Sequence, residues 1–145
     1  MQRLQLQGVV TSSTKTNPKP EKSETLELVF DRRRKVLAIS SIIEVTGATY
    51  DLLNCLAKAH LRGAGEGRDL LDYPVIQAGR LASQLGLDDE ASVRQCVSRS
   101  RGLLGKKFAS AKLERQDGRD LIENLPWNGY RLNPTRVRVR IASET

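Results

Sequence analysis

The sequence is poor in the side chains that most often build metal sites and nucleophilic sites. Its 145 residues include two cysteines and one histidine. Cys55 and Cys96 lie in separate helical patterns, and two isolated thiols are too few for a metal centre, so both are predicted to be core residues in a reducing compartment. His60 has no serine or cysteine placed with it as a nucleophile pair, and we interpret it as a helix-end residue. The sequence therefore predicts no metal, no cofactor and no enzymatic activity.

Long apolar runs are also missing. No stretch approaches the length that a membrane span needs, and the start, Met1-Gln2-Arg3-Leu4, lacks the apolar core of a signal peptide. Hydrophobic residues still make up 39% of the chain and charged residues 28%, which is typical of a globular protein. We expect one cytoplasmic domain that does not contact a membrane.

Acidic residues are scarce where basic residues are dense. The formal net charge is +7, and residues 90–145 hold twelve Lys/Arg against six Asp/Glu. Residues 25–89 hold eight against nine, and residues 1–24 hold four against two. An excess confined to the last third of the chain is expected if one surface meets a polyanion. The alternative is a basic surface that only keeps a small protein soluble.

The chain divides into an arm, a domain and a short tail. Residues 1–24 are predicted to be an arm and linker, because residues 11–24 are polar and interrupted by proline, although residues 3–7 alternate like a short strand. The domain is predicted over residues 25–141, and residues 142–145 form the tail. Three short, closely spaced strand patterns open the domain, at 26–30, 35–39 and 42–45, and predict a small antiparallel sheet.

The next patterns are helical. Thr46 can cap a helix that ends near Gly63, with an apolar stripe of Tyr50, Leu53, Leu56 and Ala57. The glycine-rich loop after it follows a helix rather than a strand and lacks a Gly-Lys-Ser/Thr end, which argues against a phosphate loop. A second helix is predicted at about 77–85, stopped by Gly86, and Asp88 or Asp89 can cap a third at about 90–106. The turn of about four residues between these two helices is a helix-turn-helix arrangement.

The predicted third helix has one basic side. At 100° per residue, its inner side collects Val93, Val97, Ser100 and Leu104, whereas its outer side presents Arg94, Gln95, Ser98 and Gly102, bordered by Arg99 and Arg101. Arginine and glutamine make bidentate contacts to base edges, and serine donates well to phosphate. No acidic residue lies between Glu90 and Glu114. A solvated helix face usually mixes signs, so this face favours a phosphate partner over plain solvent.

The only tryptophan lies in a predicted hairpin tip. Trp127 stands between Pro126 and the pair Asn128-Gly129, with strand patterns at 120–125 and 130–132 on either side. The indole could pack in the core, as tryptophan usually does. It could instead lie on a deoxyribose or a partner subunit, with Asn128 and Gly129 supplying the positive φ angles of the turn. We favour an intermediate in which one ring face packs on the hairpin.

A final strand pattern covers residues 136–141. Its apolar side holds Val137, Val139 and Ile141, and its other side holds Arg136, Arg138 and Arg140. The arginines could extend the basic surface, or they could protect a sheet edge from aggregation.

The order of these elements resembles the winged helix-turn-helix effector domain of OmpR/PhoB-type transcriptional regulators. The likeness runs from Leu26 to Leu132. The family's opening hairpin is resembled by Leu26-Glu-Leu-Val-Phe-Asp-Arg-Arg-Arg-Lys-Val36, and its first helix by Val45-Thr46 with Tyr50-Asp-Leu-Leu53. The family's recognition helix is resembled by Val93-Arg-Gln-Cys-Val-Ser-Arg-Ser-Arg-Gly-Leu-Leu104. The family's wing is resembled by Ile122 with Gly129-Tyr130-Arg131-Leu132. The Gly-Tyr-x-Leu ending is the most specific of these marks.

The resemblance implies that the third helix enters the major groove of double-stranded DNA and that the wing lies at the adjacent minor groove. The predicted groove contacts are Arg94, Gln95, Ser98 and Arg99, with Arg101 at a phosphate and Arg131, Trp127 and Asn128 along the backbone or minor groove. The chain departs from the family in the Gly63–Pro74 insertion, the short turn after the second helix, Pro126 in place of a wing arginine, and the strand beyond the wing. The 24 residues before the domain are too few for a receiver domain, so control by phosphorylation of the same chain is not expected.

We therefore predict an α+β winged helix-turn-helix domain with an N-terminal antiparallel sheet, a three-helix core, a hairpin wing and an extra strand. Its predicted function is sequence-specific binding of double-stranded DNA as a transcription regulator. A homodimer and a protein partner that supplies regulation stay open. The alternatives are a protein-interaction module that docks an acidic partner and a DNA-binding accessory subunit of a larger complex.

Overall fold

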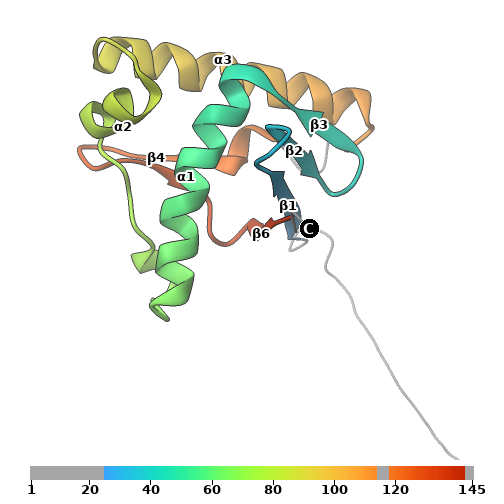
Figure 1. The fold of residues 1–145 in the computed structure, drawn as a ribbon, viewed down its shortest axis with the longest axis horizontal. Coiled ribbons are helices and arrows are strands. Elements are labelled where there is room, and N and C mark those ends of the chain that lie inside the picture. Colours follow the sequence, from blue (N-terminus) through green and yellow to red (C-terminus); the bar gives the residue numbers. More distant parts are fainter. Residues whose placement is uncertain (1–24, 114–117, 143–145) are drawn as a thin grey trace, which may run out of the picture.

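The four-stranded sheet lies at one end of the molecule and two of the helices lie at the other (Figure 1). This computed structural model describes residues 25–113 and 118–142, which form three α-helices, the sheet and a separate two-stranded hairpin. The predicted arm at 1–24 and nearly all of the predicted tail fall outside these residues. The described chain is α+β, as predicted, and its arrangement is compatible with a winged helix.

The sheet is mixed rather than antiparallel. The first three strands are β1 (Leu26–Asp31), β2 (Val36–Ile39) and β3 (Ile43–Val45). As predicted, each pairs antiparallel with the next one along the chain. The last strand, β6 (Val137–Ile141), pairs parallel with β1, with Leu26 opposite Val137. A parallel pair needs a long crossover, and here everything between β1 and β6 supplies it. The predicted antiparallel sheet of the first three strands is therefore confirmed, and the extra strand, whose partner was not predicted, makes the sheet mixed.

Side chains along β1 and β6 alternate between the core and the surface. On the inner side, Leu26, Leu28 and Phe30 are buried, Val137 is buried, and Val139 and Ile141 are partly buried. Arg140 of β6 and Arg136, just before the strand, have acidic partners: Arg140 Nε lies 3.4 Å from Glu27 Oε2, and Arg136 Nη1 lies 3.2 Å from Asp120 Oδ2. Arg138 is exposed. The predicted alternation of residues 136–141 is confirmed.

The three helices follow their predicted apolar stripes. The first, α1 (Gly47–Gly65), buries Tyr50, Leu53, Leu56 and Ala57. The second, α2 (Ala78–Leu85), ends at Gly86, whose φ of 70° confirms its predicted role as a C-terminal stop. The third, α3 (Glu90–Ser110), runs beyond the predicted residue 106 because Phe108 continues the buried stripe of Leu104 one turn further.

The start of α3 is capped as predicted. Asp89 accepts a hydrogen bond from the backbone N–H of Ser92 at 2.9 Å. This bond holds the pKa of the Asp89 carboxyl below its ordinary value. Thr46 stands at the N-cap of α1, but its side chain makes no capping bond.

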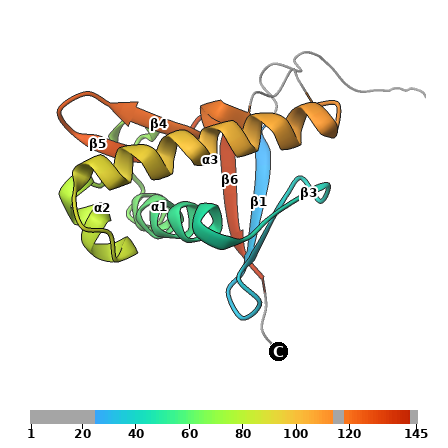
Figure 2. The ribbon, with the colours of Figure 1, turned by 90° about the horizontal axis from the view of Figure 1, so that it is seen from above.

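The C-terminal hairpin packs beside α3. It consists of β4 (Ile122–Leu125) and β5 (Gly129–Leu132), and residues Gly118–Leu121, part of which was predicted to be strand, form a 3-10 turn (η3) before it. Seen from above, the first half of α3 lies between this hairpin and α2, and its second half crosses over β1 and β6 (Figure 2).

The segment before α2 joins the hairpin through one isolated antiparallel bridge. Ile76 and Tyr130 exchange two backbone hydrogen bonds, of 2.8 and 2.9 Å. Gly129 has a φ of 131°, and a Cβ at this position would lie 2.1 Å from the carbonyl oxygen of Ile76. Only glycine allows this approach. Gly129 and Tyr130 together therefore hold the hairpin against the segment that leads into α2.

The insertion between α1 and α2 folds back on α1. It contains a 3-10 turn, η2 (Leu70–Asp72), and the ring of Tyr73 meets the ring of His60 edge-on, with centroids 4.9 Å apart. His60 is buried, and this burial lowers the pKa of its imidazole. His60 thus lies near the end of α1, as interpreted from the sequence, and is a buried packing residue there.

Candidate nucleic-acid interface

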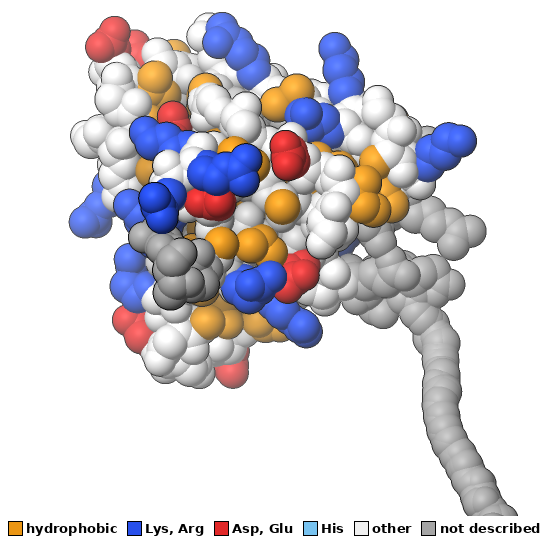
Figure 3. Space-filling view, turned by 45° about the vertical axis from the view of Figure 1, so that its right-hand side comes forward, with side chains coloured by type: hydrophobic (Ala, Val, Ile, Leu, Met, Phe, Trp, Pro, Cys, Tyr) orange, Lys and Arg blue, Asp and Glu red, His pale blue; other side chains and the backbone are white. Residues whose placement is uncertain are grey.

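The outer face of α3 is exposed and basic. Its exposed side chains are Arg94, Gln95, Ser98 and Arg99, and the buried ones opposite are Val93, Val97, Ser100 and Leu104. Ser100 shares a 3.0 Å hydrogen bond with Thr49 of α1, which explains a hydroxyl on the inner side. The two sides predicted from the helical repeat are confirmed. Around the sheet end of the molecule, by contrast, acidic and basic side chains are interspersed (Figure 3).

Gly102 interrupts this outer face without a packing reason. A Cβ at Gly102 would meet no other atom within 4 Å, so nothing in the described structure requires glycine there. Glycine in a helix interior costs about 1 kcal/mol relative to alanine. Its remaining physical advantage is that another molecule can approach the helix backbone closely.

The hairpin tip presents the indole to solvent. Trp127 is 100% exposed, so neither a core position nor a half-packed ring is correct. The Asn128 N–H bonds to the Leu125 carbonyl at 2.9 Å, and Trp127 has a φ of 70°. With Pro126 as the second residue, these are the features of a type II turn, which usually has glycine in the third place. Positive φ therefore falls on Trp127 and Gly129 rather than on Asn128 and Gly129.

This conformation costs free energy and returns no burial. A non-glycine residue in the left-handed region is disfavoured by roughly 1–2 kcal/mol. The surrounding turn holds Trp127 there with its ring fully in water. A strained and exposed aromatic side chain is the kind of outlier that calls for a functional explanation.

The hairpin tip and the outer face of α3 share a cleft. The cleft measures about 500 Å³, and its lining includes Arg94, Trp127 and Asn128. Two polar residues that the sequence patterns missed also line it, Gln77 at the start of α2 and Asn124 of β4. Glu90 is the single acidic residue of the lining. The fold thus joins one end of the outer face to the tip, although they are distant in sequence.

Arg131 does not belong to this surface. Its side chain is only 6% exposed, and its Nε lies 2.8 Å from Glu123 Oε1. The same guanidinium donates to the carbonyl oxygens of Leu71 and Tyr73, at 3.2 and 3.0 Å. The expectation that Arg131 lies along DNA was therefore wrong, because its charge is satisfied inside the protein. The sequence held one signal for this, since Glu123 is its direct partner across the hairpin.

Arg101 also has an internal partner. Its guanidinium donates to the carbonyl oxygen of Ile122, at the start of β4, and its side chain is half-buried. Arg101 thereby holds the hairpin against α3. This engagement argues against the predicted role of Arg101 as a direct phosphate contact.

Within residues 25–113 and 118–142, no group of three or more His, Cys, Asp or Glu is placed to hold a metal ion. No helix of residues 25–113 or 118–142 is long and apolar enough to cross a membrane.

No family model, no curated protein and no solved structure matches this chain.

Proposed function

We propose that this protein binds double-stranded DNA sequence-specifically, as a winged helix-turn-helix regulator of transcription. In this proposal α3 enters the major groove and the β4–β5 hairpin is the wing. The observation that carries it is the outer face of α3, where Arg94, Gln95, Ser98 and Arg99 are exposed together. An α-helix fits the major groove, and these side-chain types bond to base edges and phosphates.

Two features of the same surface support a close contact. Gly102 leaves the backbone of α3 accessible in the middle of the face. The helix also carries no acidic residue after Glu90, so a phosphate backbone would meet attraction along its length. A helix face that served only solubility would usually mix acidic and basic residues, and it would gain nothing from a glycine.

The hairpin tip supplies the second contact. Trp127 is held outward in a strained turn, and Asn128 lies beside it on the rim of the cleft. Minor-groove proteins use amide side chains to bond base edges, and they use apolar side chains as wedges against sugars and base steps. We assign the indole to a deoxyribose or a base step, where an arginine would otherwise stand.

The test is a selection of bound duplexes from a random library, followed by affinity measurements. On the selected duplex, Arg94→Ala and Gln95→Ala should each cost about 1–3 kcal/mol of binding free energy, because each removes a bidentate base contact. On random duplex the losses should be much smaller. Arg140→Ala, on the sheet edge, is the matched control and should change neither affinity.

The outcomes separate the alternatives. Equal losses on selected and random duplex would reduce Arg94 and Gln95 to phosphate contacts. If no duplex is enriched and an acidic protein binds the outer face of α3, the domain is a protein-interaction module instead. Circular dichroism of each variant must match that of the wild type before any loss is interpreted.

A further inference from the structure

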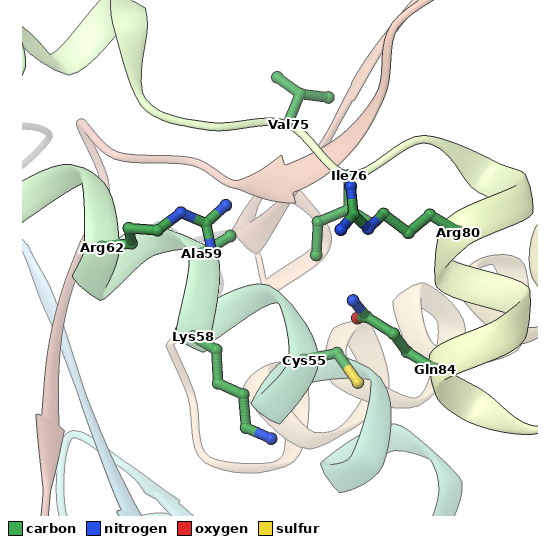
Figure 4. A pocket seen from close by; sticks show the side chains of 8 residues that line it. All are labelled: Cys55, Lys58, Ala59, Arg62, Val75, Ile76, Arg80 and Gln84. Carbon is green, nitrogen blue, oxygen red and sulfur yellow. The ribbon is translucent and has the colours of Figure 1, made fainter.

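A second basic surface lies between α1 and α2, on residues outside the proposed DNA interface. It is a hollow of about 440 Å³ whose charged lining residues are Lys58 and Arg62 of α1 and Arg80 of α2 (Figure 4). None of its lining residues is acidic. Three cations therefore line one concave site without a carboxylate among them.

These cations also lack internal partners. Across residues 25–113 and 118–142, none of Lys58, Arg62 and Arg80 makes an ion pair or a side-chain hydrogen bond. The side chains of Arg62 and Arg80 point toward one another across the hollow (Figure 4). Two guanidinium groups repel each other in this arrangement, and an anion between them converts the repulsion into two charge-assisted contacts.

The position of Arg80 makes the same point independently. Arg80 lies in the first turn of α2, which contains no acidic residue. The positive end of a helix dipole disfavours a cation there. Arg62 lies in the last turn of α1, where the negative end of the helix dipole stabilises a cation. The helix dipoles therefore favour the position of Arg62 but not that of Arg80. An external anion would offset the unfavourable placement of Arg80.

The floor of the hollow is suited to more than an inorganic ion. Ala59 of α1 and Ile76 supply an apolar lining, and Gln84 of α2 adds an amide from the opposite side. The volume falls within the range of small-molecule sites.

We propose that this hollow binds a small organic phosphate. The phosphate lies between Arg62 and Arg80, with Lys58 at the rim, and the organic group lies against Ile76 and Ala59. A doubly charged phosphate matches three cations better than a single carboxylate does. The proposal does not depend on DNA binding.

Calorimetric titration with phenyl phosphate and with inorganic phosphate tests it. Phenyl phosphate should bind more tightly than inorganic phosphate, because only its ring reaches the apolar lining. Arg62→Gln and Arg80→Gln should each weaken phenyl phosphate binding about tenfold or more, since each removes a charge-assisted hydrogen bond. Arg140→Gln removes the same charge from the sheet edge and should leave the affinity unchanged.

A second readout places the ligand. Cys55 lines the hollow and Cys96 lies on α3, outside it. Phenyl phosphate should slow alkylation of Cys55 by iodoacetamide and leave Cys96 unaffected, as measured by mass spectrometry. Equal protection of both thiols, or wild-type affinity in Arg80→Gln, would overturn the proposal. If the two arginine variants lose affinity only for duplex DNA, they contact DNA, and the hollow is not a small-molecule site.

Discussion

Within the C-terminal hairpin, a charged side chain is buried and the largest apolar side chain is exposed. Arg131 is enclosed by Glu123 and two backbone carbonyls, while Trp127 stands fully in water. Residue type alone favours the opposite assignment, since arginine is almost never buried unless paired and tryptophan usually is buried. The difference comes from the insertion before α2, whose carbonyl groups reach the hairpin from a distant part of the chain.

Arg131→Met should lower the free energy of unfolding by about 1.5–3 kcal/mol, because the carbonyls of Leu71 and Tyr73 and the Glu123 carboxylate lose a charged donor. Urea unfolding measures the loss. Arg138→Met, at an exposed position of β6, is the control and should stay within about 0.5 kcal/mol of the wild type. A stable Arg131→Met that loses DNA affinity would return this residue to the interface.

Trp127→Gly should raise the free energy of unfolding by up to about 1 kcal/mol, because glycine relieves the strain of a φ of 70° and no burial is lost. Trp127→Ala keeps the strain and should leave stability nearly unchanged. Both variants should weaken DNA binding. A loss of about 3–5 kcal/mol in Trp127→Ala would instead mean that the indole is part of the core.

At the scale of elements, local patterns predicted the helices better than they predicted the strands. The stripe of α1, the glycine stop of α2 and the Asp89 cap of α3 each depend on residues within a turn or two, so they can be read locally. The partner of β6 cannot, because nothing in its alternation distinguishes a parallel neighbour from an antiparallel one. The basic face of α3 was predictable for the same local reason, whereas the cleft it shares with the hairpin depends on tertiary contacts.

Gly102→Ala tests whether the exposed face of α3 is built for stability or for contact. Alanine should raise the free energy of unfolding by about 1 kcal/mol, since the added methyl group has open space. The same methyl group should weaken duplex binding if the backbone of α3 approaches DNA. Gly65→Ala, at the end of α1 and also in open space, should not change duplex affinity. Unaltered duplex binding by Gly102→Ala would show that the backbone of α3 does not approach DNA closely at this residue.

At the scale of the whole molecule, the basic residues separate into surfaces with different partners. Arg136, just before β6, and Arg140 within it are paired with Asp120 and Glu27, which favours edge protection over an extension of the DNA surface. On α3, the outer arginines, Arg94 and Arg99, have no acidic residue on the helix between or after them. Much of the excess positive charge in the last third of the chain therefore lies on α3.

The most direct measurement of DNA binding through α3 and the hairpin is a fluorescence titration of the only tryptophan with a selected duplex over a salt series. The free protein should emit in the red, as an exposed indole does, and the duplex should quench or shift the emission. The logarithm of the affinity should fall linearly with the logarithm of salt concentration, with a slope of about −0.9 per phosphate contacted. Arg99→Ala should flatten that slope by about one phosphate contact. An indole that ignores duplex at low salt, or that responds equally to polyglutamate, would contradict DNA binding at this surface.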